Sequence, residues 1–334
     1  MTIRTGSTAA VLARAAAMAG YAPSVHNTQP WRWAIRPDRM ELTAVRSRQL
    51  PASDPDGRLL MISCGAALHH ARTALTATGW NYTVDRLPVP DQPGLLAVLT
   101  PTAHREPDAA AARLVQTMEL RHTDRRPVSD TRIPDATLTQ VVAAAEAEGI
   151  ACGLLTGEHV YDLAGAASRA DAVEKADPEI QDELAYWIGR HDSLGIPPAA
   201  LTGEQPATTV PVRDFGQPGT LPSGPGHDRT ARYAVLFGAS DEPSSWLRAG
   251  EALSAAWLTA TRLGASVLPL SAVIEVPATR TALRRAIDDL GWPFLVLRIG
   301  IADPDHTGAA HPPRLPTAQI VDLEEVRHLL GGTD

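Results

Sequence analysis

Hydrophobic and polar positions follow the same order in two long segments that lie 185 residues apart. Residues 56–79 and 241–264 align without a gap, so that CGAALHHARTALTATG lies over AGEALSAAWLTATRLG. The identical pairs are Asp56/Asp241, Gly65/Gly250, Ala67/Ala252, Leu68/Leu253, Ala71/Ala256, Thr76/Thr261 and Gly79/Gly264. Each segment ends at a glycine, the residue that most easily takes the left-handed conformation closing a helix. The pattern predicts two related helices.

Short apolar runs flank both predicted helices. Residues 40–45 precede the first helix and residues 95–100 follow it, while residues 233–237 and 294–299 stand in the same places around the second. Apolar runs of this length are typical of strands. Because helices and strands mix in both parts of the chain, we expect an α+β fold made of two related halves.

A segment of different character lies between the two halves. Residues 195–230 contain seven prolines and six glycines in 36 positions, with almost no periodicity, after a predicted helix over residues 178–189. A loop this long in a compact protein is usually functional, such as a lid, or a linker. The pattern leaves the lid and the plain connector as alternatives.

Composition narrows the classes of function. A length of 334 residues and a net charge of −8 suggest about two globular units and argue against a nucleic-acid partner. Two cysteines exclude a disulfide framework, a zinc finger and an iron–sulfur cluster. No apolar run approaches the roughly 20 residues of a membrane span, and Arg14 interrupts residues 8–19, which favours an amphipathic helix over a signal peptide. We therefore expect a cytoplasmic protein without a membrane partner.

Several common catalytic motifs are absent. The chain has no HExxH, no GxSxG and no Walker A sequence, and the glycines of 224–226 lack the third glycine of a dinucleotide fingerprint. The adjacent His69 and His70 diverge by about 100° on a helix, which suits a structural pair better than a metal site. We predict no metal site.

The first candidate site is residues 22–31, APSVHNTQPW. Prolines at both ends stiffen the backbone, and the polar side chains between them supply hydrogen-bond donors and acceptors. Trp31 opens an apolar run and is expected to pack in the core. The pattern favours a rigid turn that holds a polar ligand, and an ordinary capped turn before a strand is the alternative.

The second candidate site is residues 120–128, LRHTDRRPV. Its three arginines would repel one another unless they are solvated or face an anion. The planar guanidinium group suits phosphate because it donates two parallel hydrogen bonds. A solvated basic turn, with Arg126 in solvent, is the alternative.

Together these motifs resemble the FMN-dependent nitroreductase superfamily. PSVHNTQPW is similar to its PSSxNxQPW loop, and RHTDR to its R-[RH]-[ST]-x-[RK] turn. The proline loop comes first here, as in the Acg branch, in which one chain contains two degenerate nitroreductase halves. ELAYW (183–187), VPVRDF (210–215) and HPPRLP (311–316) are further Acg-like features. The resemblance implies a nitroreductase-like fold with a first half at 1–110, a second half at 111–334 and a lid-like insertion at about 175–230.

The resemblance also implies which residues hold the FMN phosphate and ribityl chain. Arg121, Thr123 and Arg125 take this role, with His122 nearby through its backbone. Arg314 matches a C-terminal basic residue that completes the phosphate site in relatives.

Five other residues are implied to surround the flavin ring. Pro23, Ser24 and Asn27 line the isoalloxazine, and Leu270 and Ser271 lie near its N5 and O4 edge. No catalytic side chain is assigned, since the flavin itself carries the hydride.

The two motifs each occur once, so we expect one complete FMN site per chain and a degenerate second one. The halves would then form a pseudo-dimer within a monomer, with further dimerisation left open. The implied function is an FMN-binding oxidoreductase that transfers hydride from NAD(P)H, a transient reductant, through FMN N5 to a small organic acceptor. The alternative is an Acg-like protein that stores or sequesters flavin with little turnover.

Overall fold

The computed structural model describes residues 8–190, 192–303, 311–322, 326 and 328 of the chain. The strands are β1 (Trp31–Ile35), β2 (Met40–Ala44), β3 (Trp80–Arg86), β4 (Leu95–His104), β5 (Ala151–Leu155), β6 (Arg232–Gly238), β7 (Ser266–Leu270) and β8 (Trp292–Gly300). They form two four-stranded antiparallel sheets, ordered β1-β2-β4-β3 and β5-β6-β8-β7. The strand order within each half is the same. The expected α+β fold of two related halves is confirmed.

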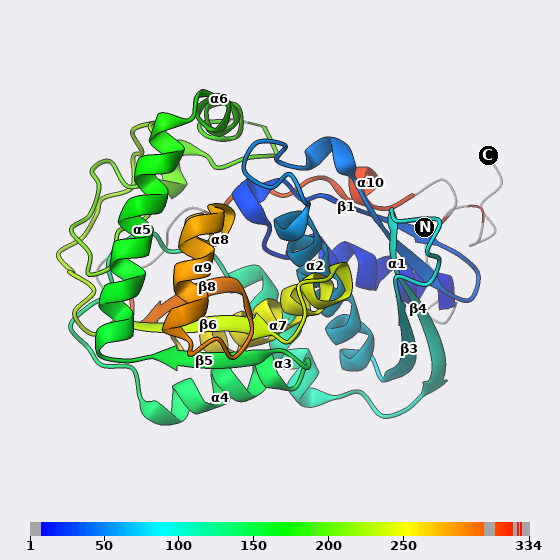
Figure 1. Cartoon of the computed structure of the whole chain (residues 1–334). Coiled ribbons are helices and arrows are strands. Elements are labelled where there is room, and N and C mark those ends of the chain that lie inside the picture. Colours follow the sequence, from blue (N-terminus) through cyan, green and yellow to red (C-terminus); the bar gives the residue numbers. More distant parts are fainter. Residues whose placement is uncertain (1–7, 191, 304–310, 323–325, 327, 329–334) are drawn as a thin grey trace.

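Helices separate and cover the two sheets (Figure 1). The helices are α1 (Thr8–Ala19), α2 (Arg58–Ala77), α3 (Ala109–Leu120), α4 (Asp135–Glu146), α5 (Glu158–Ala176), α6 (Pro178–Trp187), α7 (Pro243–Arg262), α8 (Ala272–Glu275), α9 (Pro277–Ala286) and α10 (Thr317–Ile320). Three short 3-10 turns are η1 (Val25–Asn27), η2 (Arg46–Arg48) and η3 (Pro198–Ala200). No described helix combines the length and the apolar character that crossing a membrane requires.

The two repeat helices, α2 and α7, pack against each other at the centre of the molecule (Figure 1). A Cβ atom added to Gly65 would lie 1.9 Å from the carbonyl oxygen of Leu247, and one added to Gly250 would lie 1.9 Å from that of Ile62. Ile62 and Leu247 are also 185 residues apart, so the two contacts are reciprocal, as across a two-fold axis. The repeat thus places two glycines where the helix backbones touch.

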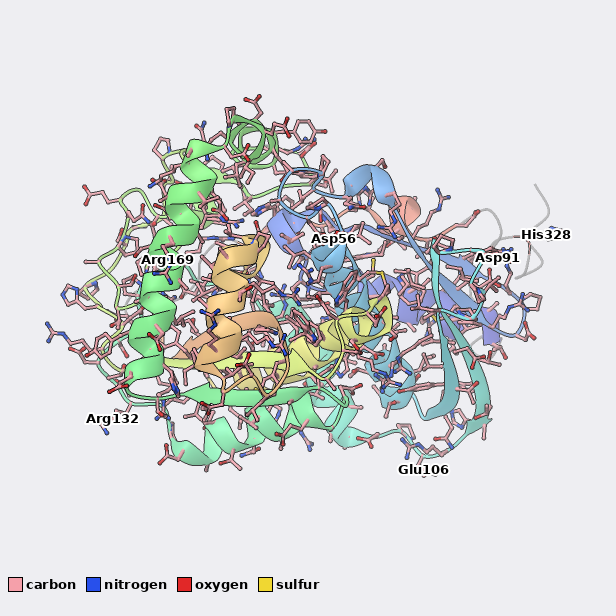
Figure 2. All side chains as sticks on the ribbon, in the orientation of Figure 1. Asp56, Asp91, Glu106, Arg132, Arg169 and His328 are labelled. Carbon is pink, nitrogen blue, oxygen red and sulfur yellow. The ribbon has the colours of Figure 1, made fainter. Side chains whose placement is uncertain are left out.

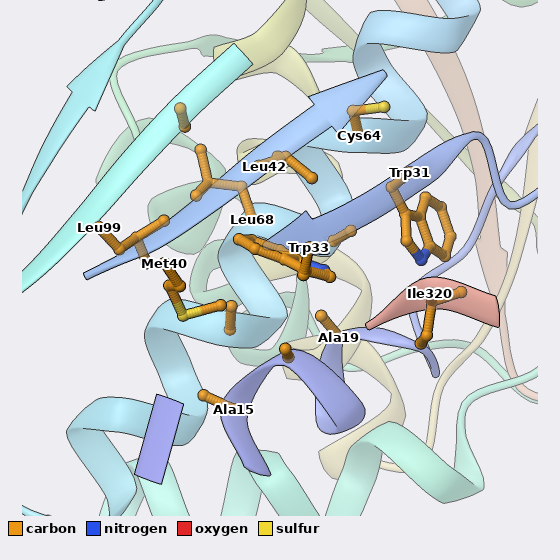
Figure 3. Packing of buried hydrophobic residues seen from close by; sticks show 14 of the residues in the cluster. Ala15, Ala19, Trp31, Trp33, Met40, Leu42, Cys64, Leu68, Leu99 and Ile320 are labelled. Atoms are coloured by element: carbon orange, nitrogen blue, oxygen red, sulfur yellow. The ribbon is translucent and has the colours of Figure 1, made fainter. Parts of the chain in front are cut away.

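The first sheet packs on α1 and α2 (Figure 3). Trp31, Trp33, Met40 and Leu42 are fully buried there, and the alternation along β1 follows the two-residue period of a strand. Trp31 is a core residue, as expected. Ile320 of α10 joins the same cluster, so the C-terminal part of the chain packs on the first half.

The predicted helix over 178–189 is present as α6. Asp177 caps it by accepting hydrogen bonds from the backbone N–H groups of Glu179 and Ile180. The chain from 188 to 231 then has a small buried cluster of its own, formed by Ile188, Ile196, Ala200 and Leu201. The domain boundary at about residue 110 and the limits of the insertion remain predictions.

Candidate functional site

One cavity of about 490 Å³ brings together segments from both halves of the chain. Its walls come from the proline loop, the start of α2, the arginine turn after α3, the middle of α7, the β7–α8 junction, residues 312–314 and the proline- and glycine-rich segment. The two sequence motifs, almost a hundred residues apart, meet here because α2, α3 and α7 pack on one another. The fold therefore builds one site from both candidate motifs.

Nine of the ten predicted site residues line this cavity. They are Pro23, Ser24, Asn27, Arg121, Thr123, Arg125, Leu270, Ser271 and Arg314. His122 is not among the lining residues, and its Nδ1 lies 3.1 Å from the carbonyl oxygen of Leu120. The structure thus gathers the predicted residues, and what they bind remains a prediction.

Three arginines of the cavity have no carboxylate partner within ion-pair distance in the described part of the chain. Arg121 donates to the carbonyl oxygen of Tyr21 at 3.4 Å and stacks on Trp257, with its guanidinium carbon 4.4 Å from the ring centre. Its Nε is buried without a partner. Arg125 donates to a backbone carbonyl at 3.0 Å, and Arg314 to Asn27 Oδ1 at 2.6 Å. These hydrogen bonds leave the charge of the cluster uncompensated.

Burial lowers the pKa values of these three arginines. It lowers the pKa of Arg125 and of Arg314 to about 10, and it lowers the pKa of Arg121 well below its ordinary value, with Arg314 adding to the effect. A buried cation without a counter-ion is costly, because the low-dielectric surroundings replace its hydration poorly. An anion bound here would relieve that cost. The donor set fits a phosphate group.

The proline loop has an unusual backbone. His26, Asn27 and Gln29 have φ angles of 44°, 56° and 47°, in the left-handed region that few non-glycine residues adopt. Ser24 Oγ holds the turn by accepting a hydrogen bond from Gln29 N at 2.9 Å. The loop therefore presents its side chains in a fixed, strained arrangement.

Two polar side chains of the proline loop, which were expected to bind a ligand, form hydrogen bonds to backbone groups of other segments. Asn27 Nδ2 donates to the carbonyl oxygens of Gly195 and Pro313, both at 3.0 Å. Gln29 Nε2 donates to Ser193 O at 2.8 Å, and its Oε1 accepts from the backbone N–H of Leu315. The loop thus joins the start of the proline- and glycine-rich segment to the C-terminal part of the chain.

The expectation that Arg126 is solvated is wrong. It is 6 % exposed and pairs with the buried Asp124 through two hydrogen bonds of 2.9 Å. The backbone carbonyl of Arg126 also accepts a 2.6 Å hydrogen bond from Arg298. Arg126 is therefore a structural residue and not a solvated member of the turn.

The proline- and glycine-rich segment carries a residue to which sequence reasoning gave no role. Arg213, in VPVRDF, lines the cavity and pairs with Glu174 of α5 at 2.6 Å and with Glu275 of α8 at 2.5 Å. Its Nη1 lies 3.0 Å from His26 Nε2. Phe215 of the same segment packs nearly perpendicular to the His26 ring, with ring centroids 5.9 Å apart. The segment therefore forms part of the site, and the VPVRDF motif was the signal for it.

Two residues of the cavity wall correspond to residues of the first half that form ion pairs. With the offset of 185, Trp257 corresponds to Arg72 and Ser271 to Arg86. Both arginines pair with the fully buried Glu251, Arg72 at 2.9 Å and Arg86 at 2.8 Å. Charged side chains thus occupy the positions equivalent to two residues of the cavity wall.

Curated relatives match nearly the whole chain. "Putative NAD(P)H nitroreductase Rv3131" of Mycobacterium tuberculosis is 35 % identical over 312 residues, which cover 91 % of this chain and 89 % of the relative. "Putative NAD(P)H nitroreductase acg" of the same organism is 30 % identical over 322 residues, covering 95 % and 97 %. "Probable NAD(P)H nitroreductase PigM" of Serratia sp. is 23 % identical, with coverage of 85 % and 86 %. No family model matches the chain.

Solved structures of FMN-dependent nitroreductases are also similar to part of the chain. The NADPH-dependent NfnB from "sphigopyxis sp. strain HMH" matches with a TM-score of 0.42 and 16 % identity, covering 63 % of this chain and 97 % of that one. NfnB from Mycobacterium smegmatis, solved with NADPH, has a TM-score of 0.40 and 15 % identity at the same coverage.

Proposed function

The chain belongs to the Acg-like branch of the nitroreductase superfamily, and from that premise we propose that it binds FMN in the cavity. The observation that carries the proposal is that Arg121, Arg125 and Arg314 line one cavity and that none of them has a described carboxylate within ion-pair distance. A phosphate monoester carries close to two negative charges at pH 7 and three acceptor oxygens. Such a group is opposite in charge to the three guanidinium groups and accepts the hydrogen bonds that they donate.

We further propose that the protein transfers hydride from NAD(P)H to a small organic acceptor, as the names of its relatives suggest. FMN, when bound, supplies the hydride carrier. The chain's own residues would bind and orient it: the arginines its phosphate, Pro23 and Ser24 its ring, and Leu270 and Ser271 one ring edge. Leu253 and Trp257 would exclude water from the apolar wall.

Flavin storage is a second candidate, supported by how firmly the proline- and glycine-rich segment is held. Arg213 is paired with two buried carboxylates, and Asn27 binds the backbone at Gly195. A segment attached in this way would open rarely. Slow opening would favour retention of flavin over exchange of substrates.

Purification followed by anaerobic reduction tests the proposed function. We expect yellow protein whose flavin absorbance is bleached by NADH or NADPH and restored by a nitroaromatic or a quinone. Fast NAD(P)H oxidation with such an acceptor would exclude storage as the main role. Protein that neither contains nor rebinds FMN would contradict both candidates.

Replacing residues 216–226 by a short glycine–serine link distinguishes the oxidoreductase function from flavin storage. In an enzyme, turnover and acceptor choice should change together, because the segment forms part of the cavity wall. In a store, the wild-type protein should be nearly inert to NAD(P)H, and the shortened form should gain flavin reduction and release FMN faster.

The same replacement in the exposed turn 88–93, which is remote from the cavity wall, is the control. It should change neither turnover nor FMN release. If both shortened proteins behave as the wild type does, the proline- and glycine-rich segment is only a connector.

A further inference from the structure

His26 combines burial, strain and access to the cavity. It is 7 % exposed, lines the cavity and has a φ of 44°. Left-handed backbone costs free energy in a residue with a Cβ, and such residues gather at functional sites. Neither the proposed FMN phosphate site nor the core accounts for an imidazole at this position.

The contact with Arg213 fixes the protonation state of the imidazole. A guanidinium group only donates hydrogen bonds, so Nε2, which lies 3.0 Å from Arg213 Nη1, must accept. A neutral imidazole whose Nε2 accepts carries its proton on Nδ1. No hydrogen-bond partner of Nδ1 is found in the part of the chain that the structure describes. The ring therefore has one donor left for a ligand.

Arg213 is held rigidly in this role. Its Nε and Nη2 bind Glu174 at 3.1 and 2.6 Å, and Nη2 also binds Glu275 at 2.5 Å. Both glutamate side chains are 3 % exposed, so this ion-pair cluster is almost entirely buried. Burial, together with the positive charges of Arg213 and Arg125, lowers the pKa of His26 well below its usual value. His26 consequently stays neutral and acts as a fixed donor, unsuited to releasing a proton.

We propose that His26 donates a hydrogen bond through Nδ1 to a planar ligand in the cavity and that Arg213 positions this donor. The inference rests on the proposed function, because it takes the ligand to be FMN or the acceptor that FMN reduces. The ligand atom is an oxygen or nitrogen on the edge of a planar ring system. It belongs either to the pyrimidine edge of the flavin or to a quinone or nitro group.

The tautomer is measured directly in protein labelled with 15N in its histidine rings. Two-bond correlation spectra should show a protonated Nδ1 and an unprotonated Nε2 for His26. The signal is assigned by its loss in His26→Asn. A protonated Nε2 would overturn the proposal without any measurement of activity.

Two variants test the donor itself. His26→Phe keeps a planar ring and removes both nitrogens, whereas His26→Asn keeps a donor and an acceptor and tolerates left-handed backbone better than most residues. Loss of one neutral hydrogen bond corresponds to about a two- to tenfold weakening. We expect His26→Phe to show that loss and His26→Asn to recover most of it.

The ligand whose binding is weakened by His26→Phe is the hydrogen-bond partner of Nδ1. If Nδ1 binds the flavin, His26→Phe should weaken FMN and riboflavin equally. If Nδ1 binds the acceptor, both flavin affinities stay unchanged and the KM for a quinone or nitroaromatic rises more than kcat falls.

Two outcomes contradict the proposal in different ways. If the wild-type protein binds FMN and His26→Phe changes neither flavin affinity nor KM, only the role of His26 is wrong. If the wild-type protein binds no FMN, the proposed function fails and this inference fails with it. Should His26→Phe not fold, the tautomer measured in the wild-type protein decides.

Discussion

At the scale of single residues, the partners of buried arginines separate structure from ligand binding. Arg126 and Arg298 each meet a buried aspartate, and Arg213 meets two glutamates. Such pairs compensate the cost of burying charge within the protein. Arg121 is similarly buried and has no carboxylate partner among the described residues, and for this reason we propose that it binds an anion.

Substituting Arg121 by alanine should therefore weaken FMN and spare riboflavin. A hydrogen bond to a charged group contributes about 1.5–3 kcal/mol, so FMN affinity should fall by roughly one to two orders of magnitude. Titration of flavin fluorescence measures both ligands. Arg132→Ala is the control, because Arg132 lies at the surface of the molecule (Figure 2). An equal loss for FMN and riboflavin would show that Arg121 does not bind the phosphate.

Buried histidines should make the protein sensitive to acid. Burial lowers the pKa of His69 to about 4 and places those of His26 and His70 well below the ordinary value. As pH falls below 6.5, the unfolded chain binds protons that the folded chain does not. The free energy of unfolding should fall by about 1.5 kcal/mol per histidine between pH 6.5 and 5.

Asp54 acts in the opposite direction, because burial raises its pKa to about 6 and the folded chain gains its proton first. It offsets only about 1 kcal/mol over the same range. Urea unfolding at pH 6.5 and pH 5 measures the balance, and His69→Gln should flatten the dependence. Stability that is constant or higher at pH 5 would contradict this account.

At the scale of elements, the crossing of α2 and α7 depends on two glycines. Gly65→Ala would push a methyl group into the carbonyl of Leu247, which is backbone and cannot rotate away. Overpacking of this kind costs about 3 kcal/mol. Thermal or urea unfolding should show that loss. In the control Gly94→Ala, the added methyl group would have no atom within 4 Å, so the free energy of unfolding should stay within about 0.5 kcal/mol of the wild type. Equal losses in the two variants would contradict a close contact between the α2 and α7 backbones at Gly65.

At the scale of the whole molecule, the two halves are alike in fold and unlike in chemistry. The cavity side has Trp257 and Ser271, and the equivalent side has Arg72 and Arg86 bound to Glu251. Moving both arginines away would leave Glu251 buried and unpaired, so this cluster cannot open easily to a ligand. On this basis we propose a single site per chain.

We therefore expect one FMN per chain, retained by the monomer. Heat release of the flavin and its absorbance give the stoichiometry, and sedimentation gives the assembly state. Two flavins per chain would contradict the role of the Glu251 cluster. Loss of flavin on dilution to monomer would show that the site needs a second chain.

Sequence alone determined much of the framework. The offset of 185 residues predicted α2 and α7 to within two residues of their ends, and the apolar runs predicted four strands around them. These features depend on local periodicity and on glycine at helix ends, which a sequence displays directly. The proline loop and the arginine turn were also recognisable as candidate sites, because their composition is unusual over a few residues.

The tertiary structure decided which members of those motifs bind protein and which face the cavity. Arg121 and Arg126 look equivalent in RHTDRR, yet one has a buried aspartate beside it and the other does not. Arg213 meets His26, Glu174 and Glu275, which lie 187, 39 and 62 residues away in the chain. Charge pairing depends on distance in space, and sequence spacing carries no information about contacts between such remote positions.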